Sequence, residues 1–355
     1  MCIVGRMALN ERLLALDGVR GLAVLVVVVG HISGRVAPFA SNIGVTVFFV
    51  LSGYLITSLL IREREKTGRT DLPAFYLRRA LRLYPALLLV LALTPMVLAI
   101  AQDNRLGDYA RRAIISGLYL ADFAEAGNDS LGFFTHMWSL AVEEQFYIVW
   151  PALLLAMAFF ARQFGRSAGF KSLAPYVYLL AGLALGWRVA ATFLLSGDRV
   201  YFAIDTNAFI LLFGCALAFV PKDLVAKAPP WLAYLMVLLI GAGSFLLPHQ
   251  PGPMREWVVV GAAVAAALLI ASATNGNKLL EIGVVRWFGT ISYGLYLWHG
   301  VLLGIHYGGA EPEGILRIAL ASTAVAIAWA SFFFFERPMQ SFLRRRFIRE
   351  PVAAP

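Results

Sequence analysis

Long apolar runs, each close to twenty residues, alternate with short polar segments along the whole chain. A run of this length crosses the hydrocarbon core of a bilayer as an α-helix, whereas a strand of a membrane barrel needs only about ten alternating residues. The pattern therefore predicts an all-α polytopic membrane protein with about ten transmembrane helices. The predicted spans are 18–34, 43–61, 82–101, 140–161, 173–195, 204–221, 231–247, 256–273, 286–307 and 315–335.

Composition supports this class and excludes others. The chain is 60% hydrophobic and only 14% charged, whereas about a quarter of the residues in a soluble domain are charged. The net charge of +9 is what cytoplasmic Lys and Arg give a membrane protein, so it does not indicate a nucleic-acid partner. The two cysteines support no disulfide framework.

Basic residues gather after every second predicted span. With ten spans and both termini in the cytoplasm, these clusters all fall on the cytoplasmic side, as membrane topology favours. The exceptions are Arg105, Arg111 and Arg112, which then lie outside. They belong to segment 102–138, in which the apolar stretch 113–123 is too short to span and is expected to be re-entrant or interfacial. We expect one membrane domain over 1–337 and a short basic cytoplasmic tail over 338–355.

The first predicted span carries ionisable residues, which are costly in lipid and therefore candidates for function. Arg20 and His31 bracket ten apolar or glycine residues, and eleven residues advance a helix by roughly 16 Å and about three turns. The two side chains therefore share a face, which Asp17 joins one turn before Arg20. The plain alternative is an Asp–Arg ion pair with His31 at the outer interface.

A basic group, Arg78, Arg79 and Arg82, stands at the cytoplasmic end of the third predicted span. Residues three or four apart are neighbours on a helix, so two of these side chains can grip one anion. The planar guanidinium suits phosphate. Ordinary cytoplasmic positive charge explains the same residues, and this alternative stays open.

The fourth predicted span carries a polar stripe of Ser139, Glu143 and Tyr147, spaced at i, i+4 and i+8. Glu144 points about 100° away from Glu143, so only one of the two glutamates is expected to enter a narrow site. The alternative is a carboxylate that caps the outer end of the helix.

The ninth predicted span repeats this spacing with Ser292, Tyr296 and His299. These residues share one helix face. They are candidates for a site, and the alternative is an aromatic packing motif.

Together these residues resemble the acyltransferase-3 family of bacterial integral-membrane O-acyltransferases, over most of the chain. The sequence departs from the family pattern at Gly300 and Val301, where relatives often carry a proline. We expect no C-terminal hydrolase-like domain and hence no fused second transfer step. The matching segments are Leu16–Gly21 with His31 (Arg-x10-His), Phe48–Tyr54 (Phe-Phe-x-x-Ser-Gly), Arg79–Arg82 (Arg-x-x-Arg), Trp138–Glu143, Ser292–His299 and Glu336–Pro338.

The resemblance implies transfer of an acyl group, usually acetyl, from cytoplasmic acyl-CoA to a hydroxyl of an extracytoplasmic or lipid-linked saccharide. It implies a place in the bacterial cytoplasmic (inner) membrane, acetyl-CoA as the donor co-substrate, a saccharide acceptor and no metal. The residues expected to hold the donor are Arg78, Arg79, Arg82 and Arg20. The residues expected to contact substrate are Ser139, Tyr147, Tyr296 and His299.

A hydroxyl that attacks a thioester needs a base and stabilisation of the oxyanion. His31 is the predicted base or acyl carrier, since imidazole titrates near neutral pH. Glu143, or else Asp17, is expected to orient it, with Arg20 positioning the donor or holding negative charge.

Two other classes compete with this interpretation. The first is a proton-coupled transporter or flippase of a glycan or lipid intermediate, which also uses intramembrane charge, although the repeats and paired broken helices of transporters are not visible. The second is a non-catalytic scaffold, which needs no buried charge. The sequence leaves open the acceptor, the acyl length and the oligomeric state, a homodimer included.

Overall fold

The computed structural model describes residues 2–33, 37, 39–163, 169–246 and 253–347, with the backbone alone for 2–13, 246 and 253–255. These residues form helices and no strand, and one isolated bridge joins Tyr307 to Ala310. The helices are α1 (Cys2–Ser33), α2 (Ala40–Thr67), α3 (Leu72–Ala101), α4 (Tyr109–Gly117), α5 (Ala121–Ala126), α6 (Trp138–Gln163), α7 (Ala174–Leu194), α8 (Gly197–Phe202), α9 (Ile204–Phe219), α10 (Lys222–Val225), α11 (Pro230–Leu246), α12 (Pro253–Ala273), α13 (Gly283–Gly304), α14 (Gly314–Ser331) and α15 (Arg337–Phe347). Short 3₁₀ turns η1 (Asn104–Asp108), η2 (Gly132–Met137) and η3 (Phe170–Leu173) and a π-helical turn η4 (Phe332–Glu336) complete the described chain.

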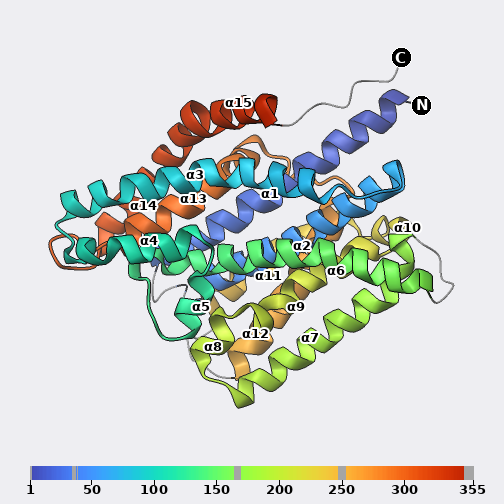
Figure 1. Ribbon diagram of the computed structural model, residues 1–355, viewed down its shortest axis with the longest axis horizontal. Coiled ribbons are helices and arrows are strands. Elements are labelled where there is room, and N and C mark those ends of the chain that lie inside the picture. Colours follow the sequence, from blue (N-terminus) through green and yellow to red (C-terminus); the bar gives the residue numbers. More distant parts are fainter. Residues whose placement is uncertain (1, 34–36, 38, 164–168, 247–252, 348–355) are drawn as a thin grey trace.

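Each of the ten predicted spans falls on a helix of this bundle (Figure 1). Within the described chain, eight helical segments are long and apolar enough to cross a membrane. The other two predicted spans correspond to the shorter apolar helix α11 and to α13, which has 22 residues. The all-α polytopic fold is confirmed, while the cytoplasmic placement of the termini stays a prediction.

The helices α2 and α3 are longer than the apolar runs within them. Arg, Glu and Lys are good helix formers, so α2 continues through its charged end to Thr67, where Gly68 adopts φ 72° and closes the helix. Asp71 then caps α3 by accepting a bond from the Ala74 N–H. The third predicted span therefore begins ten residues too late, and the predicted basic group lies inside a helix.

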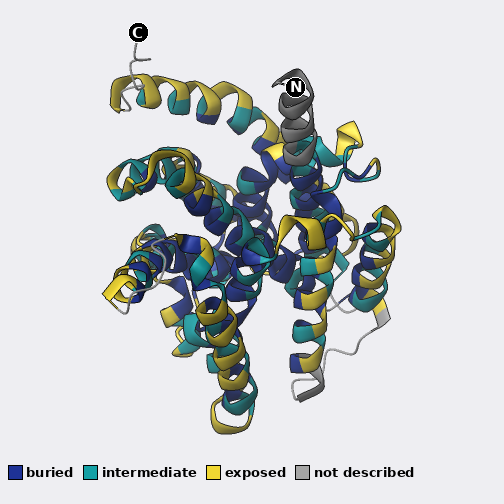
Figure 2. Ribbon diagram, turned by 90° about the vertical axis from the view of Figure 1, so that its right-hand side faces the viewer, coloured by how far each residue is buried: buried dark blue, intermediate teal, exposed yellow. Residues whose placement is uncertain are grey.

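Helix α1 passes through the middle of the bundle and packs on α13 and α2. Glycine allows α1 and α13 to touch: a Cβ on Gly21 would lie 1.9 Å from the Val285 carbonyl oxygen, and one on Gly289 would lie 1.9 Å from that of Asp17. Small residues permit such close approach in membrane bundles. Buried residues accordingly gather at the centre in Figure 2, with exposed ones around the rim. The contact fixes the register between Asp17, Arg20 and the polar face of α13.

The segment between α3 and α6 folds back onto the bundle. The predicted short stretch 113–123 is divided into α4 and α5 by Tyr119, which has φ 55°. Helix α4 packs on α3, and α5 packs on α6 and α8. At the other end of the chain, α15 forms the first part of the predicted basic tail, and residues 348–355 lie outside the described residues.

Candidate active site

A cavity of about 200 Å³ lies between α1, α2, α3, α6 and α13. It is smaller than the ~300–1,000 Å³ of pockets that enclose a drug-sized ligand, so it suits an extended chain better than a bulky group. Phe48, Phe49 and Leu55 form part of its apolar wall. Its polar lining consists of Arg20, Ser52, Arg79, Arg82, Ser139, Glu143, Glu144, Tyr147, Ser292, Tyr293 and Tyr296.

Arg79 is at the centre of the charged lining. Its guanidinium contacts Glu144 at two points, with Nε–Oε2 at 2.9 Å and Nη2–Oε1 at 2.7 Å, and Nη2 lies 3.5 Å from Glu143. Its Cζ lies 3.1 Å from the centre of the Tyr147 ring. The expectation that only one glutamate enters the site is therefore wrong. Both glutamates line the cavity, and the several N–H donors of the Arg79 guanidinium reach both carboxylates. These contacts offset much of the positive charge of Arg79.

Glu143 gathers two hydroxyl groups from different helices. Its Oε1 accepts a hydrogen bond from Ser52 Oγ at 2.5 Å and another from the Tyr147 hydroxyl at 2.6 Å. Tyr147 lies one turn further along α6, as the predicted stripe requires, whereas Ser52 comes from α2. The carboxylate is thus held in place by three helices, since Arg79 belongs to α3.

The other two arginines of the cavity differ in their pairing. Arg20 forms an ion pair with Asp17 at 3.1 Å. Arg82 is exposed at the edge of the cavity, and no carboxylate among the described residues pairs with it. Arg78 is not among the lining residues. Of the predicted donor-binding residues, the structure therefore brings Arg20, Arg79 and Arg82 to one cavity and leaves Arg78 outside.

Ser139 and Tyr296 form the wall between the cavity and a cluster of three histidines. Their hydroxyl oxygens lie 2.6 Å apart, and the Tyr296 hydroxyl donates to the His136 carbonyl at 2.8 Å. The ring centres of His136 and His299 lie 5.8 Å apart, and those of His299 and His31 lie 5.0 Å apart. Within the described part of the chain, no group of three or more His, Cys, Asp or Glu residues has an arrangement that could hold a metal ion.

The partner of His31 differs from the predicted one. His31 Nδ1 lies 3.1 Å from His299 Nε2, whereas Glu143 is bonded to hydroxyls and Asp17 to Arg20. This corrects the expectation that Glu143 or Asp17 orients His31. The reason is that Glu143 faces α3, one turn beyond Ser139, while α13 brings His299 to the end of α1.

Four polar lining or neighbouring residues were not among the predicted site residues: Ser52, Glu144, Tyr293 and His136. Ser52 belongs to the Phe-Phe-x-x-Ser-Gly segment, from which no site residue is predicted. His136 precedes the Trp138–Glu143 segment by two residues, and this proximity is the signal that could have identified it. Its ring also explains Gly300, because a Cβ there would lie 2.2 Å from His136 Cγ.

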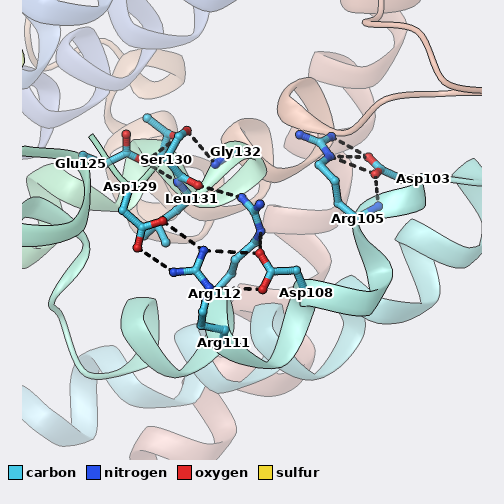
Figure 3. Close-up of polar contacts among 11 residues, drawn as sticks. Asp103, Arg105, Asp108, Arg111, Arg112, Glu125, Asp129, Ser130, Leu131 and Gly132 are labelled. Atoms are coloured by element: carbon cyan, nitrogen blue, oxygen red, sulfur yellow. Dashed lines mark hydrogen bonds and ion pairs between the residues drawn. The ribbon is translucent and has the colours of Figure 1, made fainter. Parts of the chain in front are cut away.

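Segment 102–138 carries its own network of ion pairs, drawn in Figure 3. Burial alone would raise the pKa of Asp103, but hydrogen bonds from the Arg105 side chain and backbone and from the His306 N–H hold that pKa well below its usual range. Each arginine that broke the predicted topology pattern is thus paired with a carboxylate of the same segment. The pairs are Asp103–Arg105 at 2.5 Å, Asp108–Arg112 at 2.9 Å and Asp129–Arg111 at 2.6 Å.

Comparison with known proteins gives consistent matches along the chain. It is 31% identical to the peptidoglycan O-acetyltransferase OatA of Listeria monocytogenes, over 92% of this chain and 55% of that protein. It is 34% identical to the putative peptidoglycan O-acetyltransferase YrhL of Bacillus subtilis (94% and 56%) and 30% identical to the O-acetyltransferase OatA of Staphylococcus aureus (92% and 57%). The chain thus spans just over half the length of these relatives. No solved structure matches.

A family model described as an acyltransferase domain matches residues 13–341. This range includes every residue that lines the cavity, together with the three clustered histidines. The chain therefore belongs to the acyltransferase-3 family of membrane acyltransferases.

Proposed function

We propose that this protein is a membrane O-acetyltransferase that moves an acetyl group from acetyl-CoA to a hydroxyl of a saccharide. The observation that carries this proposal is the order in which an arginine, a narrow cavity and two imidazoles follow one another through the bundle. An arginine that pairs with no carboxylate of the described residues stands at the edge of a narrow cavity, and a pair of hydrogen-bonded imidazoles lies directly behind the wall of that cavity.

In this proposal Arg82 binds the phosphates of the donor. It is the one cation of the described cavity lining without a carboxylate partner. Arginine binds phosphate through charge-assisted hydrogen bonds. The cavity itself takes the thin pantetheine arm, and the thioester reaches Ser139 and Tyr296. The donor enters from the cytoplasm, at the end of the bundle where α2 meets α3.

The reaction needs a base for the acceptor hydroxyl. His31 takes the hydroxyl proton as the oxygen bonds to the thioester carbonyl carbon. The C–S bond then breaks, and the proton passes to the departing thiolate, which leaves as the free thiol of CoA. The Ser139 and Tyr296 hydroxyls contact the acyl end, and the partly buried Glu143 and Glu144 hold Arg79 in the cavity wall.

The acceptor in this proposal is a glycan of the bacterial envelope, reached from the outer side of the cytoplasmic membrane. The names of the relatives, which include peptidoglycan O-acetyltransferases, support this class of acceptor. The position of His31, two residues before the end of α1 and behind the cavity wall, supports transfer on the side away from the donor.

The test uses the purified full chain in lipid nanodiscs with acetyl-CoA and soluble peptidoglycan fragments. Thiol release and mass spectrometry of the fragments report transfer. We expect His31→Ala to lower kcat by about 10²-fold or more, as removal of a general base does. His306→Ala is the matched control, because its ring lies at the α13–α14 connection, away from the cavity. Wild-type rates in His31→Ala would contradict the assigned base, and the absence of acetylated product in the folded wild-type protein would contradict the function.

A further inference from the structure

His299 is fully buried, and both of its ring nitrogens are engaged. Nδ1 lies 2.9 Å from the carbonyl oxygen of Leu295, one turn earlier on α13, and Nε2 lies 3.1 Å from His31 Nδ1. Rings of His136 and Tyr296 pack around it, with centres 5.8 Å and 5.4 Å away. The imidazole therefore has one fixed orientation.

These contacts determine where the protons are. A carbonyl oxygen only accepts hydrogen bonds, so Nδ1 of His299 carries the hydrogen. A charged imidazolium without a carboxylate partner is costly in a buried site, and the neutral ring has a single N–H. Nε2 of His299 is therefore an acceptor, and His31 Nδ1 must donate to it. The free lone pair of His31 is then on Nε2.

We propose that His299 is a positioning residue that fixes the tautomer of His31 and so presents its Nε2 as the basic nitrogen. This proposal rests on the proposed function, in which His31 accepts the proton of the acceptor hydroxyl. The Leu295 carbonyl and His299 together do what an orienting carboxylate does for a histidine base, which is to hold one tautomer and one ring orientation.

The surrounding backbone supports this role. His31 lies near the end of α1 and His299 on α13, and these helices are in backbone contact at Gly21 and Gly289. A crossing without room for a Cβ has little freedom to slide. The separation of the two imidazoles is thus set by the helix crossing and not by loops.

The test compares two substitutions of His299 that differ in where they place an amide. The longer side chain of His299→Gln brings its oxygen near the position of Nε2, where it can accept from His31. The shorter side chain of His299→Asn reaches only the position of Nδ1. The assay is thiol release from acetyl-CoA with soluble peptidoglycan fragments, and kcat and KM are determined separately in full-length protein in nanodiscs.

We expect His299→Asn to lower kcat by about 10²-fold, the scale of a lost base, with KM for acetyl-CoA within about twofold because the donor cavity is untouched. We expect His299→Gln to keep kcat within about fivefold of wild type, since the acceptor is restored. An equal fall in kcat in both variants, or a rise in KM in place of a fall in kcat, would overturn the proposal in favour of a packing role.

The two proposals fail in different ways. If His31→Ala is inactive while His299→Asn has the wild-type kcat, the role of His299 is refuted and the proposed function stands. If His31→Ala keeps the wild-type kcat, the assigned base is wrong and the role of His299 falls with it. Binding of CoA to each variant shows that it is folded.

Discussion

Replacing Arg82 by alanine tests the proposed donor site directly. Arg82 is the unpaired cation of the described cavity lining, whereas Arg79 already contacts two carboxylates and Arg20 contacts one. The matched control is Arg78→Ala, which removes the same charge from the same helix at a residue that does not line the cavity. We expect the Arg82 variant to bind CoA more weakly and the Arg78 variant to bind it almost as wild type does.

The magnitude follows from the contact that is lost. A hydrogen bond to a charged group contributes about 1.5–3 kcal/mol, and about 1.4 kcal/mol is tenfold in Kd. Because Arg82 is exposed at the cavity edge, water and salt weaken its interaction, so the lower end of the range applies. We therefore expect Kd for CoA to rise about tenfold at low salt, with a smaller rise at about 1 M salt, where the screening length is near 3 Å.

Isothermal titration of nanodisc-embedded protein measures these constants. Pantetheine, which lacks phosphate, serves as the second ligand, and Arg82→Ala should leave its Kd unchanged. Two results would refute the reasoning. One is an equal loss of CoA affinity in Arg78→Ala, which would indicate a general field of positive charge. The other is an equal loss of pantetheine affinity, which would indicate a change in the cavity itself.

Three further predictions concern the packing and the charges around this site. Gly300→Ala places a Cβ 2.2 Å from His136 Cγ, so it should lower both the melting temperature and kcat, although alanine favours a helix. The control Gly182→Ala meets no atom within 4 Å and should lower neither the melting temperature nor kcat. Burial raises the pKa of Asp122 to about 6, so the protonated carboxyl stabilises the fold at low pH, and this contribution is lost as pH rises from about 4 to 6. The melting temperature of Asp122→Asn minus that of wild type should therefore rise across this pH range. A difference in melting temperature that does not change with pH would contradict the raised pKa. Glu144→Gln removes a negative charge from the cavity, so it should lower Kd for CoA severalfold at low salt in the same titration, and a higher Kd would show that the carboxylate is needed to shape the site.

The sequence by itself determined the elements and their local faces. Run length predicted the spans, because the thickness of a bilayer sets how many apolar residues a helix needs. Helical periodicity placed Asp17 beside Arg20 and Tyr147 beside Glu143, and both contacts are present. Such contacts join residues three or four apart on one helix, so they do not depend on how helices pack.

Only the tertiary structure decided which helices meet and therefore which groups are paired. It placed Glu143 against Ser52 and near Arg79, and it paired His31 with His299. It left Arg82 without a carboxylate partner among the residues that the structure describes. These outcomes depend on the rotation and crossing of helices far apart in the chain, which backbone contacts such as that at Gly21 fix. Periodicity gives the face of a side chain but not the partner across from it, and for that reason the charges of the site could be predicted while their pairing could not.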